Sequence, residues 1–486
     1  MATLTAPASE PLTDRRKQLI LLLTCLGQFM VVLDIAIVTV ALPAMKHSLD
    51  FSATGLQWVV NAYTLTYAGF LLLGGRAADI YGRRKIFLVG LAVFTVASLV
   101  CGLAWSPAAM VTARAIQGLG GAILSPATLT ILIVTFTDPR ERAHALGIWS
   151  AALACGGATG ALAGGFLTDY IDWRWIFLIN VPIGIVGFIL AQRVLRESRA
   201  EGATRTLDVA GAVTVTAGLT SLVYAVVQTN SHAWGSPATI VPLVLAGILI
   251  AAFIVIERRA KAPLVPFATF KSRSLAGANF VMLMIGASMF AMWYFVSLYL
   301  QEVLHYSPMQ AGLCFFPAAV AVVIGAQVSG RIVGKFGPRM IMAVSTVVVG
   351  LSLIWMSETT ATSTYFSGIF GPITIAALGL GFSFPAGTFA ATAGVAPQNA
   401  GLASGLVNAN RQLGGAIGLA VLATIAEQYT TSLLATTPVP QAITDGYTLA
   451  FVIGGIFAFV AAAGSFIVPA RIKPRQPQAV VIEASD

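Results

Sequence analysis

The sequence is poor in charged residues: Asp, Glu, Lys and Arg make up only 10% of its 486 residues. An average soluble domain carries about 25%, so this chain lacks the polar side chains that a water-exposed surface of its size needs. Hydrophobic residues instead make up 57%. This composition excludes disordered, collagenous and disulfide-rich proteins. The net charge of +9 does not indicate nucleic-acid binding, because membrane topology explains the basic residues better.

Cysteine and histidine are also scarce, with four residues each. The histidines never occur at metal-ligand spacing, and the chain has no G-x-x-x-x-G-K-[ST] motif. The sequence therefore predicts no metal, no bound cofactor and no ATP hydrolysis by a P-loop. Each cysteine falls in an apolar segment, so we expect four buried, unpaired thiols, at Cys25, Cys101, Cys155 and Cys314.

Apolar segments of membrane-spanning length recur along the whole chain. A spanning helix needs about 20 apolar residues, and long continuous segments favour helices over a β-barrel. The sequence predicts an all-α polytopic membrane protein with fourteen transmembrane helices. They lie at about 19–43, 54–74, 86–105, 108–132, 144–168, 174–192, 207–227, 238–256, 274–300, 310–330, 339–357, 365–389, 402–426 and 447–469.

The positions of Lys and Arg test this number of helices. With both termini in the cytoplasm, all but four of the 28 basic residues fall in inner segments. The outer loops hold only Lys46 and Arg174, as expected if basic residues mark cytoplasmic loops. The first apolar segment is too long for a cleaved signal peptide and contains Asp34. We therefore predict a multi-pass protein of the bacterial inner (plasma) membrane, with both termini cytoplasmic and lipids as partners.

The two halves of the chain share glycines at an offset of about 255–259 residues. The matched pairs are Gly75 and Gly330, Gly82 and Gly337, Gly156 and Gly414, and Gly160 and Gly418. Such repeats build transporters that rock around a central site. The expected parts are a tail (1–18), a six-helix bundle (19–192), linkers with two inserted helices (193–273), a second bundle (274–470) and a tail (471–486). The inserted pair stands outside the repeat, so we expect it to be peripheral to the transport path.

Only three charged residues lie well inside the predicted helices: Asp34, Arg114 and Arg411. A charge at mid-bilayer costs roughly 3 kcal/mol, so such residues are functional candidates. At 1.5 Å per residue, Asp34 and Arg114 lie about 13 Å and 9 Å from the outer surface, close enough in depth to interact. The pair predicts a protonation site at Asp34 that Arg114 tunes, and a permanent structural ion pair is the alternative. For Arg411, which has no acidic sequence neighbour, structural pairing explains the charge as well as coupling does.

Polar, aromatic and methionine side chains on three helices are the candidates for solute binding. Aromatic and Met surfaces can repack around varied apolar ligands, and an acidic group suits a cationic one. Aromatic residues near helix ends also serve as interface anchors, which is the alternative for several of them. The candidates, besides Asp34, are Gln28, Gln57, Trp58, Asn61, Tyr63, Met289, Met292, Trp293 and Tyr294.

The loop between the second and third predicted helices reads GRAADIYGRRK over residues 75–85. Gly82 permits a tight turn, and Asp79 can accept hydrogen bonds from Arg83 or from a helix N-terminus. The loop resembles the signature G-x-L-A-D-R-x-G-R-[KR]-[RK] of the major facilitator superfamily. In that family the loop latches the cytoplasmic side of the outward-open state. The resemblance assigns this gating role to Gly75, Asp79, Gly82, Arg83 and Arg84.

Further motifs resemble the fourteen-helix drug:proton antiporters of the same superfamily. Residues 114–122 are similar to the proton-coupling motif R-x-x-Q-G-x-G-A, which adds Gln117 to the coupling residues, and residues 33–43 and 411–416 resemble other motifs of this group. The exporter motif G-x-x-x-G-P-x-x-G-G has Ala161 here in place of proline. Its glycines are retained and allow close helix approach: Gly156, Gly160, Gly164 and Gly165.

The resemblance implies a proton-coupled antiporter that exports lipophilic or cationic drugs by alternating access, with the proton gradient as its energy source. We expect a monomer that binds the solute and protons but no nucleic acid. A dedicated exporter of one native metabolite is the first alternative. A cation-coupled importer is the second, because the exporter motif lacks its proline. A channel or a lipid-embedded enzyme is disfavoured, since the repeat suits alternating access and the predicted helices hold no catalytic cluster.

Overall fold

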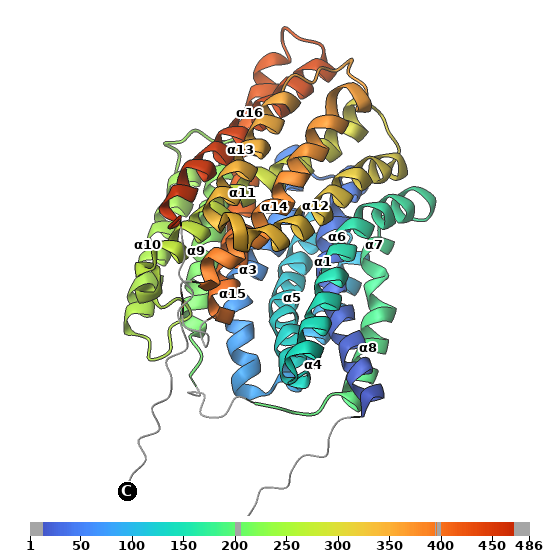
Figure 1. Ribbon diagram of the computed structural model, residues 1–486. Coiled ribbons are helices and arrows are strands. Elements are labelled where there is room, and N and C mark those ends of the chain that lie inside the picture. The colour runs from blue at the N-terminus through green and yellow to red at the C-terminus, as the bar shows by residue number, and fades with distance from the viewer. Residues whose placement is uncertain (1–12, 200–205, 394, 396–399, 471–486) are drawn as a thin grey trace, which may run out of the picture.

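The computed structural model describes residues 13–199, 206–393, 395 and 400–470, and these residues fold almost entirely into helices (Figure 1). The predicted tails lie mostly outside the described residues. The first half of the chain forms α1 (Asp14–Leu49), α2 (Ala53–Leu56), α3 (Trp58–Tyr81), α4 (Arg83–Gly102), α5 (Pro107–Thr135), α6 (Pro139–Tyr170), α7 (Trp175–Leu178) and α8 (Asn180–Val194). Two inserted helices follow, α9 (Val209–Gln228) and α10 (Pro237–Arg259).

The second half begins after a short 3-10 turn, η1 (Phe267–Lys271). Its helices are α11 (Arg273–Leu298), α12 (Pro308–Phe336), α13 (Pro338–Met356), α14 (Phe370–Ala393), α15 (Ala400–Leu433) and α16 (Val439–Gly464). Two π-helical turns adjoin them, η2 (Tyr299–Val303) and η3 (Tyr365–Ile369). Each of the fourteen predicted segments therefore has one long helix, and the prediction of an all-α architecture is confirmed.

Twelve of the described helices are long and apolar enough to cross a membrane. The other two long helices, α3 and α15, have 24 and 34 residues, but they carry polar side chains such as Asn61, Asn408 and Arg411. These two helices pack against each other. Their polar side chains therefore lie against protein rather than lipid, which explains their lower hydropathy.

The repeat in the sequence is visible in the helix packing. In the first half α1 packs on α6, and α5 packs on α3 and α4; in the second half α11 packs on α15, and α14 packs on α12 and α13. Gly82 and Gly337 occupy equivalent turns, and they are the glycines with positive φ in the described part of the chain, at 113° and 78°. Such a backbone conformation favours glycine because it has no Cβ.

The two halves are joined by polar contacts at the ends that we predict to face outward. Lys46 Nζ at the end of α1 lies 2.7 Å from Glu302 Oε1 in η2. Nearby, Ser297 Oγ donates to the Thr39 carbonyl (2.8 Å). On the other side of the interface, Ser307 Oγ donates to the Asp169 carboxylate (2.6 Å). The two halves are therefore closed against each other at this end, in what we call the outer closure.

The inserted helices lie along one edge of the molecule (Figure 1). Helix α9 packs on α3 and α15, whereas α10 packs mainly on α9, and only 11% of the most apolar stretch of α10 is buried in protein. Trp58 of α3 lies against Tyr224 of α9, with ring centroids 6.2 Å apart. Gln428 of α15 donates to the Thr229 carbonyl (3.0 Å). That the pair stands outside the transport path stays a prediction.

The expectation of four buried thiols is wrong for two of the cysteines. Cys25 and Cys101 are buried, but Cys155 is exposed and Cys314 is half-buried. Cys155 lies on α6, whose apolar side chains also face outward in part. An apolar segment in a membrane protein predicts contact with lipid as readily as burial in protein.

Candidate functional site

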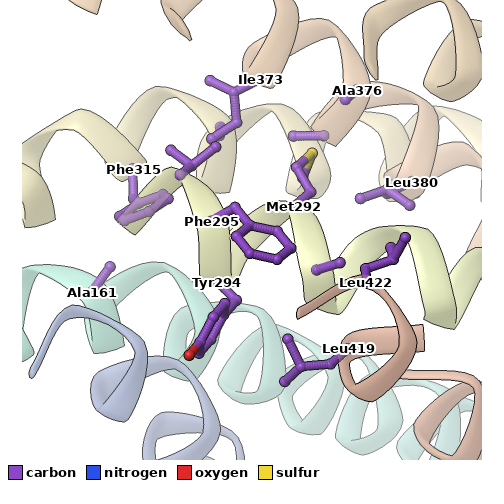
Figure 2. Packing of buried hydrophobic residues seen from close by; sticks show 14 of the residues in the cluster. Ala161, Met292, Tyr294, Phe295, Phe315, Ile373, Ala376, Leu380, Leu419 and Leu422 are labelled. Atoms are coloured by element: carbon purple, nitrogen blue, oxygen red, sulfur yellow. The ribbon is translucent and has the colours of Figure 1, made fainter. Parts of the chain in front are cut away.

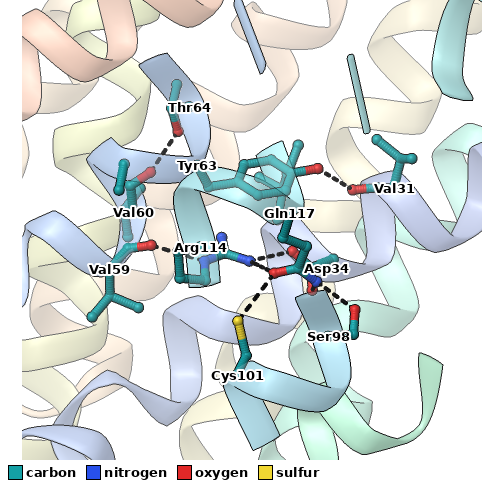
Figure 3. Close-up of polar contacts among 12 residues, drawn as sticks. Val31, Asp34, Val59, Val60, Tyr63, Thr64, Ser98, Cys101, Arg114 and Gln117 are labelled. Carbon is teal, nitrogen blue, oxygen red and sulfur yellow. Dashed lines mark hydrogen bonds and ion pairs between the residues drawn. The ribbon is translucent and has the colours of Figure 1, made fainter. Parts of the chain in front are cut away.

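Asp34 and Arg114 form a fully buried ion pair in the first half of the molecule (Figure 3). Asp34 lies in the middle of α1 and Arg114 in the outer half of α5. Arg114 Nη1 donates to Asp34 Oδ2 at 2.5 Å. The two residues that the depth estimate paired are therefore in direct contact.

Gln117, one turn further along α5, holds the other carboxylate oxygen. Its Nε2 donates to Asp34 Oδ1 (2.7 Å) and its Oε1 accepts from Arg114 Nη1 (2.6 Å). Residues i and i+3 lie on one helix face, so the R-x-x-Q spacing presents both side chains to the same carboxylate. Both oxygens of Asp34 are thereby hydrogen-bonded, which fixes the orientation of the carboxylate.

Helices α3 and α4 complete this polar cluster. Arg114 Nε donates to the Val59 carbonyl (2.9 Å), and its guanidinium lies 4.3 Å from the centre of the Tyr63 ring. From α4, Ser98 Oγ accepts from Gln117 Nε2 (2.7 Å), and the Cys101 thiol donates weakly to Gln117 Oε1 (3.7 Å). Sequence reasoning missed the two α4 residues, because a lone Ser or Cys in an apolar segment gives no signal.

The remaining solute-binding candidates of the first half lie in three different environments. Gln28 belongs to a separate polar cluster, where its Oε1 accepts from Ser125 Oγ of α5 (2.9 Å). Trp58 packs against α9, as described above. Gln57 and Asn61 are fully buried, and none of their side-chain N and O atoms has a hydrogen-bond partner. Buried amides normally find partners, so these two are the strongest candidates to bind a solute or water.

Gln57, directly before α3, and Asn61, in its first turn, lie on a side of α3 that points toward the other half of the molecule. Leu65, the next residue at helical i+4 spacing, packs in one cluster with Ala416 and Ala420 of α15. The unpartnered amides therefore lie on the side of α3 that faces α15. A solute held there would contact both halves at once.

The four candidate side chains on α11 point in different directions from the helix. Met292 is buried in the core of the second half, whereas Tyr294 points to the opposite side, toward the first half (Figure 2). Trp293 lies against Phe315 of α12, with ring centroids 5.3 Å apart. Met289 is partly buried and packs on the same core. Of these four, Tyr294 is the one placed to reach across the interface.

Arg411 on α15 does not join the Asp34 cluster. Its Nη2 donates to Asn408 Oδ1 (2.8 Å) one turn away, and its guanidinium lies 4.9 Å from the Phe384 ring centre. No carboxylate pairs with Arg411 among the residues that the structure describes. Neither interpretation of Arg411 is decided by these contacts, and a coupling role stays a prediction.

The loop between α3 and α4, which we predict to be cytoplasmic, is bonded to the segment that follows α8. Asp79 pairs with Arg83 one turn away (3.0 Å), and the backbone N–H groups of Arg84 and Lys85 donate to the Glu197 carboxylate (3.2 Å each). Glu197 thus neutralises the N-terminus of α4. A Cβ on Gly82 would lie 2.3 Å from Glu197 Oε1. Sequence reasoning missed Glu197, although it is the one acid in the basic segment 193–199.

We expect Asp79→Asn to slow the exchange between inward- and outward-facing states without changing solute preference. The Asp79–Arg83 pair is partly exposed, so its loss should cost at most about 1 kcal/mol, a change of up to about fivefold in rate. Spin-label distances across the cytoplasmic face measure the exchange. Asp138→Asn, which alters a cap on α6 instead, is the control. An unaltered distance distribution in Asp79→Asn would count against the latch.

The exporter-motif glycines bring α6 close to α1, the helix that carries Asp34. A Cβ on Gly160 would lie 2.6 Å from the Ala36 Cβ, and one on Gly164 would lie 2.6 Å from the Ile37 carbonyl oxygen. Gly165 instead faces α12 of the other half, where a Cβ would lie 2.5 Å from the Pro308 carbonyl. The motif therefore sets the spacing of α1 and α6 and the outer closure between the halves.

Gly160→Ala is expected to destabilise the protein by about 1–3 kcal/mol, because overpacking forces α1 and α6 apart. Export should fall with it, since the shift displaces Asp34. Thermal unfolding in detergent and solute flux are the two measurements. The control is Gly147→Ala on the same helix, where a Cβ meets nothing within 4 Å. Equal stability of the two variants would contradict the close-packing role of Gly160.

Comparison with known proteins supports the family inferred from the motifs. The pattern of the family described as Major Facilitator Superfamily matches residues 24–419. The chain is 42% identical to the cephamycin export protein CmcT of Amycolatopsis lactamdurans, over 94% of this chain and 93% of that protein. It is 36% identical to the puromycin resistance protein pur8 of Streptomyces alboniger, over 92% and 89% of the two chains.

The fold has counterparts among solved structures. An inward-facing bacterial homologue of the human lysosomal transporter Spinster superposes with a TM-score of 0.68, at 18% identity, over 94% of this chain and 97% of that one. At this identity the likeness concerns the fold alone. The matched pattern and the full-length relatives show that this multi-pass membrane protein belongs to the major facilitator superfamily of transporters.

Proposed function

We propose that the chain is a proton-coupled antiporter that exports drugs or antibiotics of lipophilic or cationic character by alternating access. The observation that carries this proposal is the Asp34–Arg114–Gln117 cluster, a carboxylate buried in a membrane helix with its ion-pair partner. Such a group is costly in a membrane and is retained for function. The resemblance to relatives named for antibiotic export and resistance supports the direction of transport.

In this proposal Asp34 takes up and releases the coupling proton. When the carboxylate is ionised, Arg114 and Gln117 hold it; when it is protonated, the charge attraction to Arg114 is lost, and the arginine keeps its bonds to Gln117 and Val59. The two protonation states thus tie α1 to α5 differently. Helix α1 also carries Lys46 and Thr39, which contact the second half at the outer closure. A movement of α1 on protonation of Asp34 would therefore also change these contacts.

The solute would bind between the halves, at the unpartnered amides Gln57 and Asn61 on α3 and the aromatic side chains of α11. In the proposed arrangement fourteen helices cross the bacterial inner membrane, both termini are cytoplasmic and the transporter works as a monomer. A dedicated exporter of one compound is the second candidate. It is favoured by relatives whose names specify single antibiotics, cephamycin and tetracenomycin C.

Transport in proteoliposomes with an acidic interior tests the proposal. Addition of ethidium or puromycin outside should drive uptake of the solute and speed the loss of interior protons, read with a trapped pH dye. Solute and protons entering together would indicate an importer-type symport. Uptake with no proton movement would refute proton coupling. Competition among many solutes indicates a multidrug exporter, and flux of one compound alone indicates the dedicated type.

A further inference from the structure

A cavity of about 220 Å³ lies near the outer end of the second half, beside the closure. Most of its walls come from α11, η2, α15 and α16, and Lys46 of α1 projects into it from the first half. The polar or charged groups that matter are Lys46, Glu302, Glu427, Tyr294 and Tyr447. The cavity thus brings two carboxyl groups and one ammonium group together. It is separate from the Asp34 cluster, whose residues do not line it.

Glu302 is engaged on both of its oxygens. Oε1 accepts from Lys46 Nζ at 2.7 Å, and Oε2 accepts from the Tyr447 hydroxyl at 3.1 Å. The Tyr447 ring lies beside Phe295 in a tilted arrangement, with centroids 5.2 Å apart. A carboxylate bordered by aromatic rings is the usual environment for an ammonium group, and here that ammonium belongs to Lys46.

The cavity also contains polar groups that have no partner. Glu427 makes no ion pair within 4 Å among the described residues. Tyr294 lines the cavity and is only 4% exposed. Its hydroxyl forms no hydrogen bond with another residue that the structure describes. The cavity therefore has two carboxyl groups and one ammonium group in its walls.

The acidic and the basic side chains that line the cavity belong to different halves of the transporter. Glu302, Glu427, Tyr294 and Tyr447 all lie on the second half, whereas Lys46 lies on α1. Opening of the outer side must break the Lys46–Glu302 pair and withdraw Lys46 with α1. The two carboxyl groups then stay together, without their cation, at the point where an exported solute leaves.

We infer that the outer cavity binds the positively charged group of an exported cationic solute, and that Lys46 is a built-in competitor which occupies the cavity while the outer side is closed. This inference rests on the proposed export function and gives its cationic solutes a binding site near the outer end. The solute replaces Lys46 when the halves separate. On closure Lys46 returns to Glu302 and displaces the solute outward, which disfavours rebinding.

The test measures equilibrium binding of ethidium to the purified full-length protein in nanodiscs of neutral lipid, with no gradient. Lys46→Met keeps the length of the side chain but removes the competing charge. It should tighten ethidium binding by about threefold to fivefold, the scale of one partly exposed charge pair. Binding of uncharged phenanthridine, which has the same ring system, should not change. Lys46→Arg keeps the positive charge and should bind ethidium as the unaltered protein does.

Adding Glu302→Gln to Lys46→Met should remove the gain, because the carboxylate that Lys46 occupied is then neutral. The inference is overturned if ethidium and phenanthridine gain equally, since that result indicates only a loosened closure. It is also overturned if the gain survives Glu302→Gln. If Lys46→Met does not fold, Glu427→Gln alone must weaken ethidium binding, and unchanged binding overturns the inference.

These outcomes are independent of proton coupling. Binding is read without flux, so a gain in Lys46→Met supports the cavity even if transport in proteoliposomes moves no protons. Conversely, if export is proton-coupled but Lys46→Met does not tighten ethidium binding, the proposed function stands and the cavity is not a binding site for the solute. Asp34→Asn in the Lys46→Met background should retain the gain, because Asp34 does not line the cavity.

Discussion

Asp34→Asn should reduce uphill export to the level of empty liposomes while equilibrium binding of the solute persists. The neutral amide cannot lose and regain a proton, so the proposed coupling step disappears. The substitution also leaves Arg114 as a buried cation without its partner, which costs about 3–5 kcal/mol. The amide NH2 would further face the Gln117 Nε2 donor that now bonds to Asp34 Oδ1. Lower thermal stability should therefore accompany the loss of transport.

Export of ethidium driven by an imposed pH gradient measures the effect, with equilibrium binding of the same dye alongside. Asp445→Asn is a suitable control, because Asp445 accepts one hydrogen bond from Gln441 within α16 and lies outside the cluster. The double variant Asp34→Asn with Arg114→Gln removes both charges and should recover stability but not coupled export. If proton-coupled export persisted in Asp34→Asn, Asp34 would not be the protonation site. Its role would then be that of a structural ion pair with Arg114.

Arg114→Lys should lower the export rate by about tenfold or more, although the positive charge is kept. Arg114 donates to Asp34, to Gln117 and to the Val59 carbonyl through the fixed fork of its guanidinium. An ammonium group cannot reproduce this planar arrangement. At least one charge-assisted hydrogen bond is lost, each worth about 1.5–3 kcal/mol. Insertion into the membrane should be unaffected, because the charge at this depth is the same.

The rate of solute-driven proton release and the amount of folded protein in the membrane are the readouts. Arg174→Lys in the outer loop is the matched control, since Arg174 is about one third exposed and rests on the Trp173 ring. If the Arg114→Lys variant supported the same rate as the unaltered protein, the guanidinium geometry would have no role. Arg114 would then act only as a point charge near Asp34.

The sequence was sufficient to predict the fold class, the number of long helices and the central ion pair. Burial of charge in a membrane is so costly that Asp34 and Arg114 stand out in any apolar segment, and equal depth implied that they meet. Gln117 came from the motif, and its i+3 spacing explains its bond to the same carboxylate. Gln28 did not follow this logic: it lies on the same helix as Asp34 but bonds to another part of α5.

The outer cavity was invisible in the sequence because its residues lie at predicted helix ends. The predicted helix 402–426 stops one residue before Glu427, whereas α15 continues to residue 433. Glu302 lies in a π-helical turn that continues α11, and Lys46 was assigned to an outer loop. Charges at such positions are normally solvated. Only the packing of the two halves shows that these three groups line one cavity.

The position of α9 determines which side of the interface between the halves is shielded from lipid. The two halves meet along two seams, one between α3 and α15 and one between α6 and α12. Helix α9 covers the first seam: its Tyr224 lies against Trp58 of α3, and the Thr229 carbonyl directly after α9 accepts a hydrogen bond from Gln428 of α15. At the second seam, a Cβ on Gly165 would lie 2.5 Å from the Pro308 carbonyl oxygen, and one on Gly312 would lie 2.5 Å from the Ala161 carbonyl oxygen. The interface is therefore asymmetric: an additional helix covers one seam, and the other depends on direct contact between two helix backbones.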